Sequence, residues 1–129
     1  MIDCIRFTTP AAVGSPGAAT ATGYSLQVSG RVLSVHLAYH DTPPATSDVT
    51  LVDENDPAGE ASLSLANANT DLRCCPRRAV QDNAGSDLTF DGTHKLCTPY
   101  VVYGRLLGSL AQANAGDSVT FTVWLDGAP

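Results

Sequence analysis

Two histidines have a spacing that could support metal binding. His36 and His40 are four positions apart, a spacing that places two imidazoles on one face of a helix, as zinc enzymes use. The surrounding residues alternate between apolar and polar side chains, which indicates a strand. Four strand residues span about 13 Å, too far for two imidazoles to share one ion. We therefore interpret both histidines as polar-face residues.

The cysteines form a second possible metal set with His94. Cys74, Cys75 and Cys97 would complete four zinc ligands, but neighbouring strand residues point to opposite faces, so the adjacent pair does not easily reach one tetrahedral site. Cysteine is also among the most frequently buried residue types. Because the N-terminal residues lack the pattern of an export signal, we expect Cys4 and the other three to be reduced, buried thiols rather than disulfides. The sequence predicts no metal and no cofactor.

Two charged clusters could bind partners. The segment 53–60 offers carboxylate and amide oxygens of the kind that calcium prefers, but it lacks the spacing of a helix–loop–helix calcium loop and is typical of a solvated turn. Arg73, Arg77 and Arg78 are three of the seven basic residues and lie within six positions. They favour either an ion-pair contact with an acidic partner or the shielding of an edge strand.

No pattern for covalent catalysis stands out. The residues Val13–Gly17 contain the letters of a nucleophile elbow in the wrong order, with no strand before them. A phosphate-binding glycine loop is also missing from the sequence. We predict no enzyme, although a catalytic triad assembled from distant residues remains an alternative.

These groups are positioned by strands. Period-two alternation marks Gly30–His40 and Ser118–Asp126, and the second of these ends at the turn pair Asp126-Gly127. Shorter strands are expected at 48–52, 60–66, 71–80 and 88–97, with a hairpin at Asp91-Gly92, and one more long strand is expected at 99–111. About eight short strands separated by turns predict an all-β, antiparallel β-sandwich of jelly-roll type spanning residues 24–129.

The first 23 residues form a separate part in this interpretation. Ile2–Thr8 has apolar residues on both faces, so it is either a strand or an arm bound to a partner, and we expect Ile2, Ile5 and Phe7 to contribute to an interface. Thr9–Gly23 is rich in alanine, glycine and proline and poor in large apolar side chains, which favours an extended arm or linker.

Charge and hydropathy restrict the partners. Thirteen acidic and seven basic residues give a net charge of −6, which disfavours nucleic acid and anionic membranes as partners. No apolar run approaches the roughly 20 residues that cross a bilayer. We expect the chain to be made in the cytoplasm.

Several short stretches resemble a known class of protein. Gly23-Tyr24-Ser25, Gly30–Tyr39, Pro44–Thr50, Asn69-Thr70-Asp71 and Pro76-Arg77 resemble small structural proteins of tailed bacteriophages. The resemblance implies a jelly-roll protein on the virion, made in the host cytoplasm and placed on the capsid surface as a cement or decoration protein. It also implies two partners, the major capsid protein and further copies of the chain in a homotrimer.

Two other functions remain open. A receptor- or glycan-binding module of a head fibre or tail would use surface aromatic residues, for which the candidates are Tyr24, Tyr39, Tyr100, Tyr103 and Trp124. A metal-dependent enzyme on a cupin-like double sheet is the third possibility.

Overall fold

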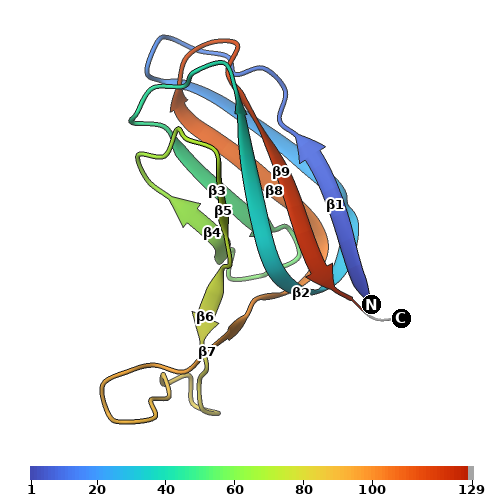
Figure 1. Cartoon of the computed structure of the whole chain (residues 1–129), viewed down its shortest axis with the longest axis vertical. Coiled ribbons are helices and arrows are strands. Elements are labelled where there is room, and N and C mark those ends of the chain that lie inside the picture. Colours follow the sequence, from blue (N-terminus) through green and yellow to red (C-terminus); the bar gives the residue numbers. More distant parts are fainter. Residues whose placement is uncertain (128–129) are drawn as a thin grey trace.

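The computed structural model describes residues 1–127 and contains only strands, turns and loops there (Figure 1). The nine strands, in chain order, are β1 (Ile2–Thr8), β2 (Ala19–His40), β3 (Asp48–Asp53), β4 (Ala61–Leu65), β5 (Leu72–Cys74), β6 (Arg77–Ala79), β7 (Cys97–Pro99), β8 (Val101–Ala113) and β9 (Ser118–Asp126). The expected all-β, antiparallel fold is therefore confirmed. No helix in this part of the chain has the length and apolar character needed to cross a membrane.

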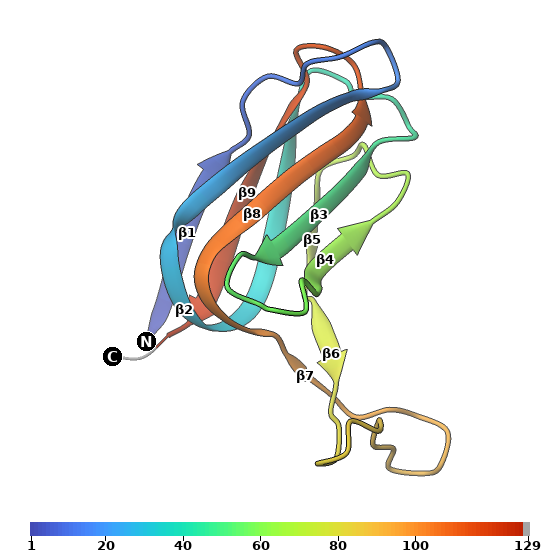
Figure 2. The same cartoon turned by 180° about the vertical axis from the view of Figure 1, so that it is seen from behind.

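The strands form a sandwich because β2 is long enough to belong to both layers. Its second half pairs with β9 and β5, and β1 extends this layer beyond β9. Its first half pairs with β8, followed by β3 and β4 in the other layer. Dividing β2 into two strands and leaving out β6 and β7 gives a body of eight strands. When these are renumbered 1 to 8 in chain order, one layer has the order 1-8-3-6 and the other has the order 2-7-4-5, which is the jelly-roll order (Figures 1 and 2).

Gly30 is the residue at which β2 passes from one layer to the other. Its φ of 137° is rarely adopted by other residues. A side chain here would also place its Cβ 2.5 Å from the carbonyl oxygen of Asp126. Glycine is thus required both for the backbone conformation and for the close approach of β2 to the end of β9.

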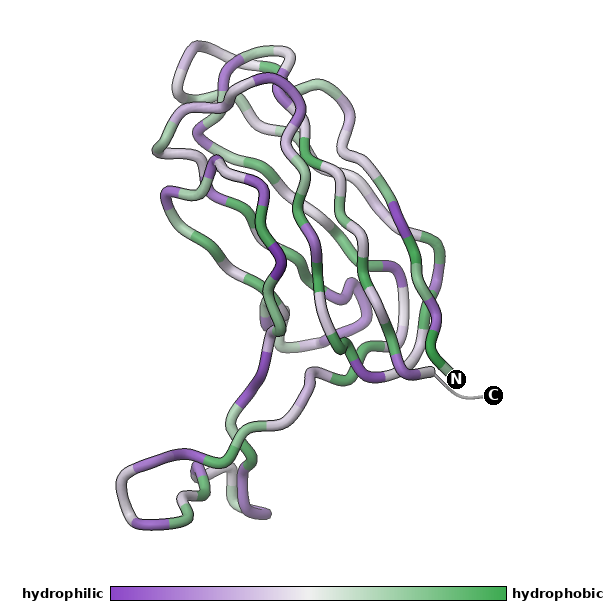
Figure 3. Tube along the Cα trace, in the orientation of Figure 1, coloured by the Kyte–Doolittle hydropathy of each residue, from purple (hydrophilic) through white to green (hydrophobic). Residues whose placement is uncertain are grey.

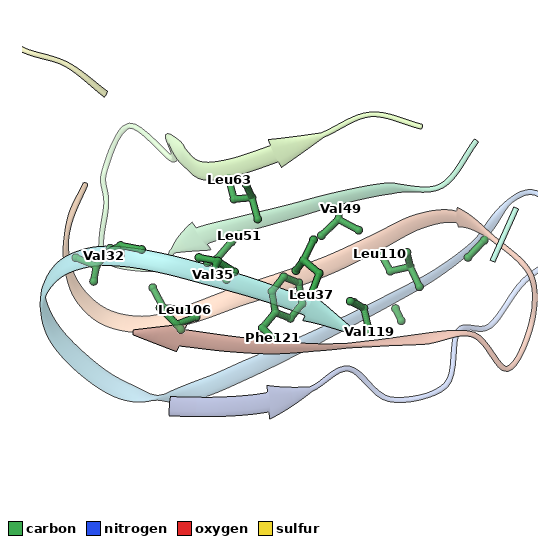
Figure 4. Packing of buried hydrophobic residues seen from close by; sticks show 14 of the residues in the cluster. Val32, Val35, Leu37, Val49, Leu51, Leu63, Leu106, Leu110, Val119 and Phe121 are labelled. Carbon is green, nitrogen blue, oxygen red and sulfur yellow. The ribbon is translucent and has the colours of Figure 1, made fainter. Parts of the chain in front are cut away.

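The core lies between the two layers and consists of aliphatic side chains around one aromatic ring (Figure 4). Phe121 of β9 is fully buried and stacks on Phe7 of β1 with ring centroids 5.0 Å apart. Leu106 and Leu110 of β8 face it from the other layer and are also buried. The alternation of hydrophobic and hydrophilic residues along the strands, visible in Figure 3, matches this inside and outside division.

The strand predicted at Gly30–His40 is present, but its inward face differs at one end. A β-bulge lies between Val32 and Ser34. It turns Val32 into the core beside Val35 and Leu37, while Leu33, which has the same alternation as these two in the sequence, remains only partly buried. The extra bulge residue is the reason that simple alternation fails at Leu33.

Residues 9–23 are not a free arm in this structure, so that interpretation is corrected. Ala12, Ala19 and Ala21 are buried in the core, and β2 already begins at Ala19. The amide of Ala12 donates to the carbonyl of Asp117, and Thr9 exchanges hydrogen bonds with Val119. Small side chains allow this segment to lie close to the sandwich, so a scarcity of large apolar residues did not mean detachment.

One element leaves the sandwich. β6 and β7 pair with each other and project from one end of the body, carrying residues 80–96 at their tip (Figures 1 and 2). We call residues 77–99 the ribbon and residues 80–96 the knob. The ribbon is inserted between β5 and β8, so the prediction that these residues form strands of the sandwich is wrong for residues 77–99.

Candidate interaction surfaces

The knob is a small three-armed structure held by backbone hydrogen bonds. The amide of Val80 donates to Leu96, that of Leu96 donates to Leu88, and that of Leu88 donates to Val80, at distances of 2.8 to 3.1 Å. Two turns, 82–86 and 91–94, connect the three arms. The predicted hairpin at Asp91-Gly92 is the second turn, and the amide of Phe90 donates to the carbonyl of His94 across it.

The knob has one polar and one apolar side, because residues 80, 88 and 96 alternate with residues 81, 87 and 95. On the polar side, Asp87 accepts from Gln81 at 3.1 Å and pairs with Lys95 at 2.7 Å. The apolar side carries Val80, Leu88 and Leu96, with Leu88 and Leu96 about two-fifths exposed. Phe90 is 68% exposed and stacks only on the His94 ring.

A side lined by exposed apolar residues is unusual for an element that has no hydrophobic core of its own. All residues from 81 to 97 are exposed. An isolated two-stranded ribbon is only marginally stable in water, and exposed apolar clusters mark contact sites. The knob is therefore the feature of this molecule best suited to docking on another protein.

Aspartates close both knob turns. Asp82 accepts from the amides of Ala84 and Ser86, and these bonds lower the pKa of its carboxyl. Asp91 accepts from the amides of Thr93 and His94 and contacts the His94 ring, which lowers the pKa of Asp91 in the same way. Both carboxylates therefore remain charged at neutral pH and keep the turns in one conformation.

The three predicted arginines do not form one cluster. Arg73, on the edge strand β5, lies over the Trp124 ring with its guanidinium carbon 4.4 Å from the ring centroid. Arg77 donates to the carbonyl of Leu33 at 3.2 Å, at the base of the ribbon. Arg78 points toward β4 and approaches Glu60 at 3.7 Å. The structure thus brings Arg73 and Arg77 to β2 and separates Arg78 from them.

The N-terminal candidates also divide between two faces. Ile5 and Phe7 pack against the core from β1, whereas Ile2 is 60% exposed. Ile2 is thus the one of the three that presents most of its side chain to a partner.

The remaining chemistry-bearing groups are held apart or already hydrogen-bonded. Asp53 accepts from the amides of Asn55 and Tyr103, and Asp56 accepts from those of Ala58 and Glu60. These bonds support the interpretation of 53–60 as a turn rather than a calcium loop. Within residues 1–127, no group of three or more histidine, cysteine and acidic side chains is placed to hold a metal ion.

The cysteines are free but are less buried than expected. Cys4, Cys75 and Cys97 are exposed and only Cys74 packs partly against the core. Cys4 lies on the outward side of β1 and Cys97 lies on the ribbon, so neither has a core to enter. Burial and the neighbouring Cys75 raise the pKa of Cys74, which disfavours its reactive thiolate form.

The outward side of the β2–β8–β3–β4 layer carries a different patch. Arg105 forms a two-bonded ion pair with Glu54 at 2.7 and 2.8 Å and lies 4.1 Å from the centroid of the Tyr24 ring. Tyr24 and Tyr103 are 49% and 65% exposed. The guanidinium is thus fixed between a carboxylate and an aromatic ring, with a second aromatic side chain two residues away on β8.

A hollow of about 350 Å³ opens at the β1 edge of the sandwich. It is lined by Asp3, Cys4, Ile5, Gln27, Val28, Ser29 and Leu125. This lining combines one carboxylate with mostly neutral side chains and contains no nucleophile paired with a base.

The chain matches no protein-family model and no curated protein. Several solved structures are weakly similar to it. The serine protease of Aeromonas sobria, in complex with its chaperone, is 10% identical with a TM-score of 0.47, and the match covers 99% of this chain and 28% of that one. This chain therefore spans little more than a quarter of that protein.

Two further structures are similar to a lesser degree. The family 32 carbohydrate-binding module of NanJ from C. perfringens, in complex with galactose, is 8% identical with a TM-score of 0.43, over 94% of this chain and 93% of that one. The VP2 subviral particle of infectious bursal disease virus is 11% identical with a TM-score of 0.30, over 100% and 42%. Likenesses at these levels identify neither a family nor a function.

The knob is the candidate surface that sequence reasoning missed. Leu88 and Phe90 satisfy the strand pattern, which predicts a place inside the sandwich. The available signal was the density of turn residues around them, since 82–86 and 91–94 leave room for only very short strands between.

Proposed function

We propose that this chain is a non-enzymatic structural protein of a tailed-phage virion, a cement or decoration protein that stabilises the head by bridging major capsid protein subunits. The sequence resemblance to small phage structural proteins supports this function. The single observation that carries it is the projecting knob, which presents Leu88, Phe90 and Leu96 to solvent beyond the end of the sandwich.

The knob suits a protein that acts through many weak contacts. Its exposed apolar side is small, so one contact lies near or below the roughly 1,200 Å² of a minimal specific interface. On a capsid shell the same contact is repeated many times. Once one copy of a linked assembly is bound, the remaining copies bind as if within one molecule, so the overall affinity exceeds that of a single contact. The sandwich then serves as a rigid body that holds the knob in place.

The test is co-sedimentation with purified phage heads that lack the protein. The full chain should pellet with the heads and saturate at a fixed ratio to the major capsid protein. A variant in which residues 80–96 are replaced by a short Gly-Ser turn should keep the sandwich fold by circular dichroism and bind at least about tenfold more weakly. Equal binding by this variant would refute the role of the knob, and no binding by the full chain would refute the function.

A second function is favoured by one observation, the Tyr24–Arg105–Glu54 arrangement beside Tyr103. Exposed aromatic rings next to a fixed charged group are suited to stack on a sugar ring and to hydrogen-bond its hydroxyls. A receptor- or glycan-binding module would therefore use this face. Reproducible binding on a glycan array that is lost in Tyr24→Ala and Tyr103→Ala, but kept in the knob variant, would favour this function over the first.

A further inference from the structure

The outward side of the β1–β9–β2–β5 layer is basic, although the chain as a whole has a net charge of −6. We call this surface the basic face; its central charged residues are Arg6 and Arg73, with half-buried His36 beside Arg73. Arg6 donates to the Thr122 hydroxyl at 3.1 Å, and Arg73 lies on Trp124. Within residues 1–127 neither arginine has a carboxylate partner.

The acidic groups around the basic face are occupied elsewhere. Asp126 forms ion pairs with Arg31 and the N-terminal amine, which together lower its pKa. Asp71 accepts from the amide of Tyr39, and Asp41 lies near His40 at the far end of β2. The centre of the face is thus left with two cations that no acidic group of the described chain neutralises.

The knob has the opposite charge. It contains three aspartates and one lysine, and Lys95 is paired with Asp87. Among the described residues, Asp82 has no cationic partner and Asp91 has only the His94 ring. The knob therefore carries two carboxylates beside an exposed apolar side.

The two surfaces do not meet within one copy. The ribbon points away from the sandwich in both views (Figures 1 and 2). From Pro99 at the base of the ribbon to Asp91 in the knob is eight residues, or at most roughly 26 Å of extended chain. Every residue from 81 to 97 is exposed, as expected for an element without an intramolecular partner.

We propose that the knob of one copy docks on the basic face of a second copy. Asp82 and Asp91 then lie against Arg73 and Arg6, and the apolar side of the knob covers Trp124 and the exposed Ile2. This inference rests on the proposed function: the knob links neighbouring copies, the linked copies attach to the major capsid protein together, and loss of the knob weakens binding to heads because that linkage is lost. Because the contact joins two different surfaces, it leaves a knob and a face unfilled until the assembly closes.

Charge and apolar area have separate roles in this contact. Each exposed ion pair contributes up to about 1 kcal/mol, selects the partner, accelerates association and is weakened by salt, so the two pairs together are worth about tenfold in affinity. Burial of Phe90, Leu88 and Leu96 against Ile2 and the half-buried Trp124 supplies the rest of the affinity. Assembly of the wild-type protein should consequently shift toward the monomer as salt rises.

The first test measures the mass of the purified full chain in solution by sedimentation velocity. We expect a discrete oligomer, with the homotrimer predicted above as the reference size. The face variant Arg6→Gln/Arg73→Gln and the knob variant Asp82→Asn/Asp91→Asn should each be monomeric, with at least about tenfold weaker association. Asparagine keeps the turn-closing acceptors, so the knob should retain its shape. Arg105→Gln, which removes a cation from the opposite sheet face, is the matched control and should assemble like the wild type.

The second test mixes the two monomeric variants. The face variant still has an intact knob and the knob variant an intact face, so an equimolar mixture should form a complex of one copy of each. A wild-type chain that is monomeric at about 100 μM, or a mixture that stays monomeric, would overturn the inference. If a variant does not fold, the salt dependence of wild-type assembly decides, and a mass unchanged up to about 1 M salt overturns it.

Binding to phage heads separates this inference from the proposed function. A monomeric wild-type chain that still pellets with heads would refute only the contact between copies. An oligomer that follows the mixing rule but ignores heads would refute the proposed function and leave the contact standing.

Discussion

The core has no room for a side chain at Gly108, so Gly108→Ala should destabilise the fold. A Cβ at this position would lie 2.4 Å from Cε2 of Phe121 and 2.8 Å from its Cδ2 and Cζ atoms. Ordinary contacts begin at 3.4 Å, so the ring has to move by about 1 Å. The ring is fully buried and is confined on its other side by Phe7, with which it stacks.

The size of the effect follows from two opposing terms. Forcing a methyl group into a well-packed core costs about 1–3 kcal/mol. Replacing glycine by alanine returns about 0.4–1 kcal/mol by restricting the unfolded chain, because Gly108 does not adopt a left-handed φ. We expect a net loss of about 1–2 kcal/mol in the free energy of unfolding. Ser109→Ala, one position along the same strand but facing outward, should change it by less than about 0.5 kcal/mol.

A double-mutant cycle isolates the clash. Phe121→Leu removes the ring atoms that a Cβ at position 108 would meet, so Gly108→Ala should cost little in that background. The two substitutions should therefore couple by about 1–2 kcal/mol in urea unfolding with unchanged m values. Additive effects, or a Gly108→Ala variant as stable as the wild type, would show that the ring does not pack on Gly108 as described.

Three further substitutions test other parts of the structure. Phe90→Ser should weaken co-sedimentation with heads but leave the free energy of unfolding within about 0.5 kcal/mol of the wild type, because Phe90 is 68% exposed and packs on nothing in the sandwich. A large loss of stability in urea would show that the knob supports the body. The hydrogen bonds from Arg105 lower the pKa of Glu54 below 4.5, so the Glu54–Arg105 pair stabilises the fold above that pH, and this stabilisation is lost as pH falls through the lowered pKa. Glu54→Gln should therefore make the acid side of a plot of urea midpoint against pH shallower, and an unchanged acid side would contradict the ion pair. Burial raises the pKa of Tyr39 from 10.0 to about 12, so the free energy of unfolding should decrease as pH rises between these values, and Tyr39→Phe should remove this decrease. Because the buried Tyr39 hydroxyl has no hydrogen-bond partner among the described residues, the substitution should also raise the free energy of unfolding at pH 7 by about 1 kcal/mol. A Phe variant that is less stable at pH 7 would contradict this assignment.

The sandwich itself was predictable because its strands obey alternation. The predicted bounds of Ser118–Asp126 are those of β9, and in β8 the buried Val102, Leu106 and Leu110 lie an even number of positions apart, as alternation requires. These positions are fixed by burial on one face, which leaves a periodic trace in the sequence. The bulge after Val32 was not predictable in this way, because a bulge changes the phase of the pattern without changing its composition.

The candidate surfaces were harder to predict, since exposure outside the sandwich leaves no periodic trace. Leu88 and Leu96 look like strand residues in sequence, and only their distance from the other strands in space reveals an apolar surface with nothing to cover it. The arginine positions were noticed, but their neighbourhood in sequence suggested one cluster. Alternation along β6 sends Arg77 and Arg78 to different sides. The other unpaired arginine on the basic face is Arg6, which is more than sixty positions from Arg73 in the chain and three strands away in the layer.

The ribbon is a useful attachment element because its two legs are fixed to the same strand. Arg77 on the outgoing leg donates to the carbonyl of Leu33, and Tyr100, just after the returning leg, accepts from the amide of Val32 at 2.9 Å. Both anchors lie beside the Gly30 bend, where β2 joins the two layers. A force on the knob is therefore carried into the strand that holds the sandwich together. An insertion attached this way can expose apolar residues to a partner without loosening the core, which separates the surface that binds from the structure that must stay folded.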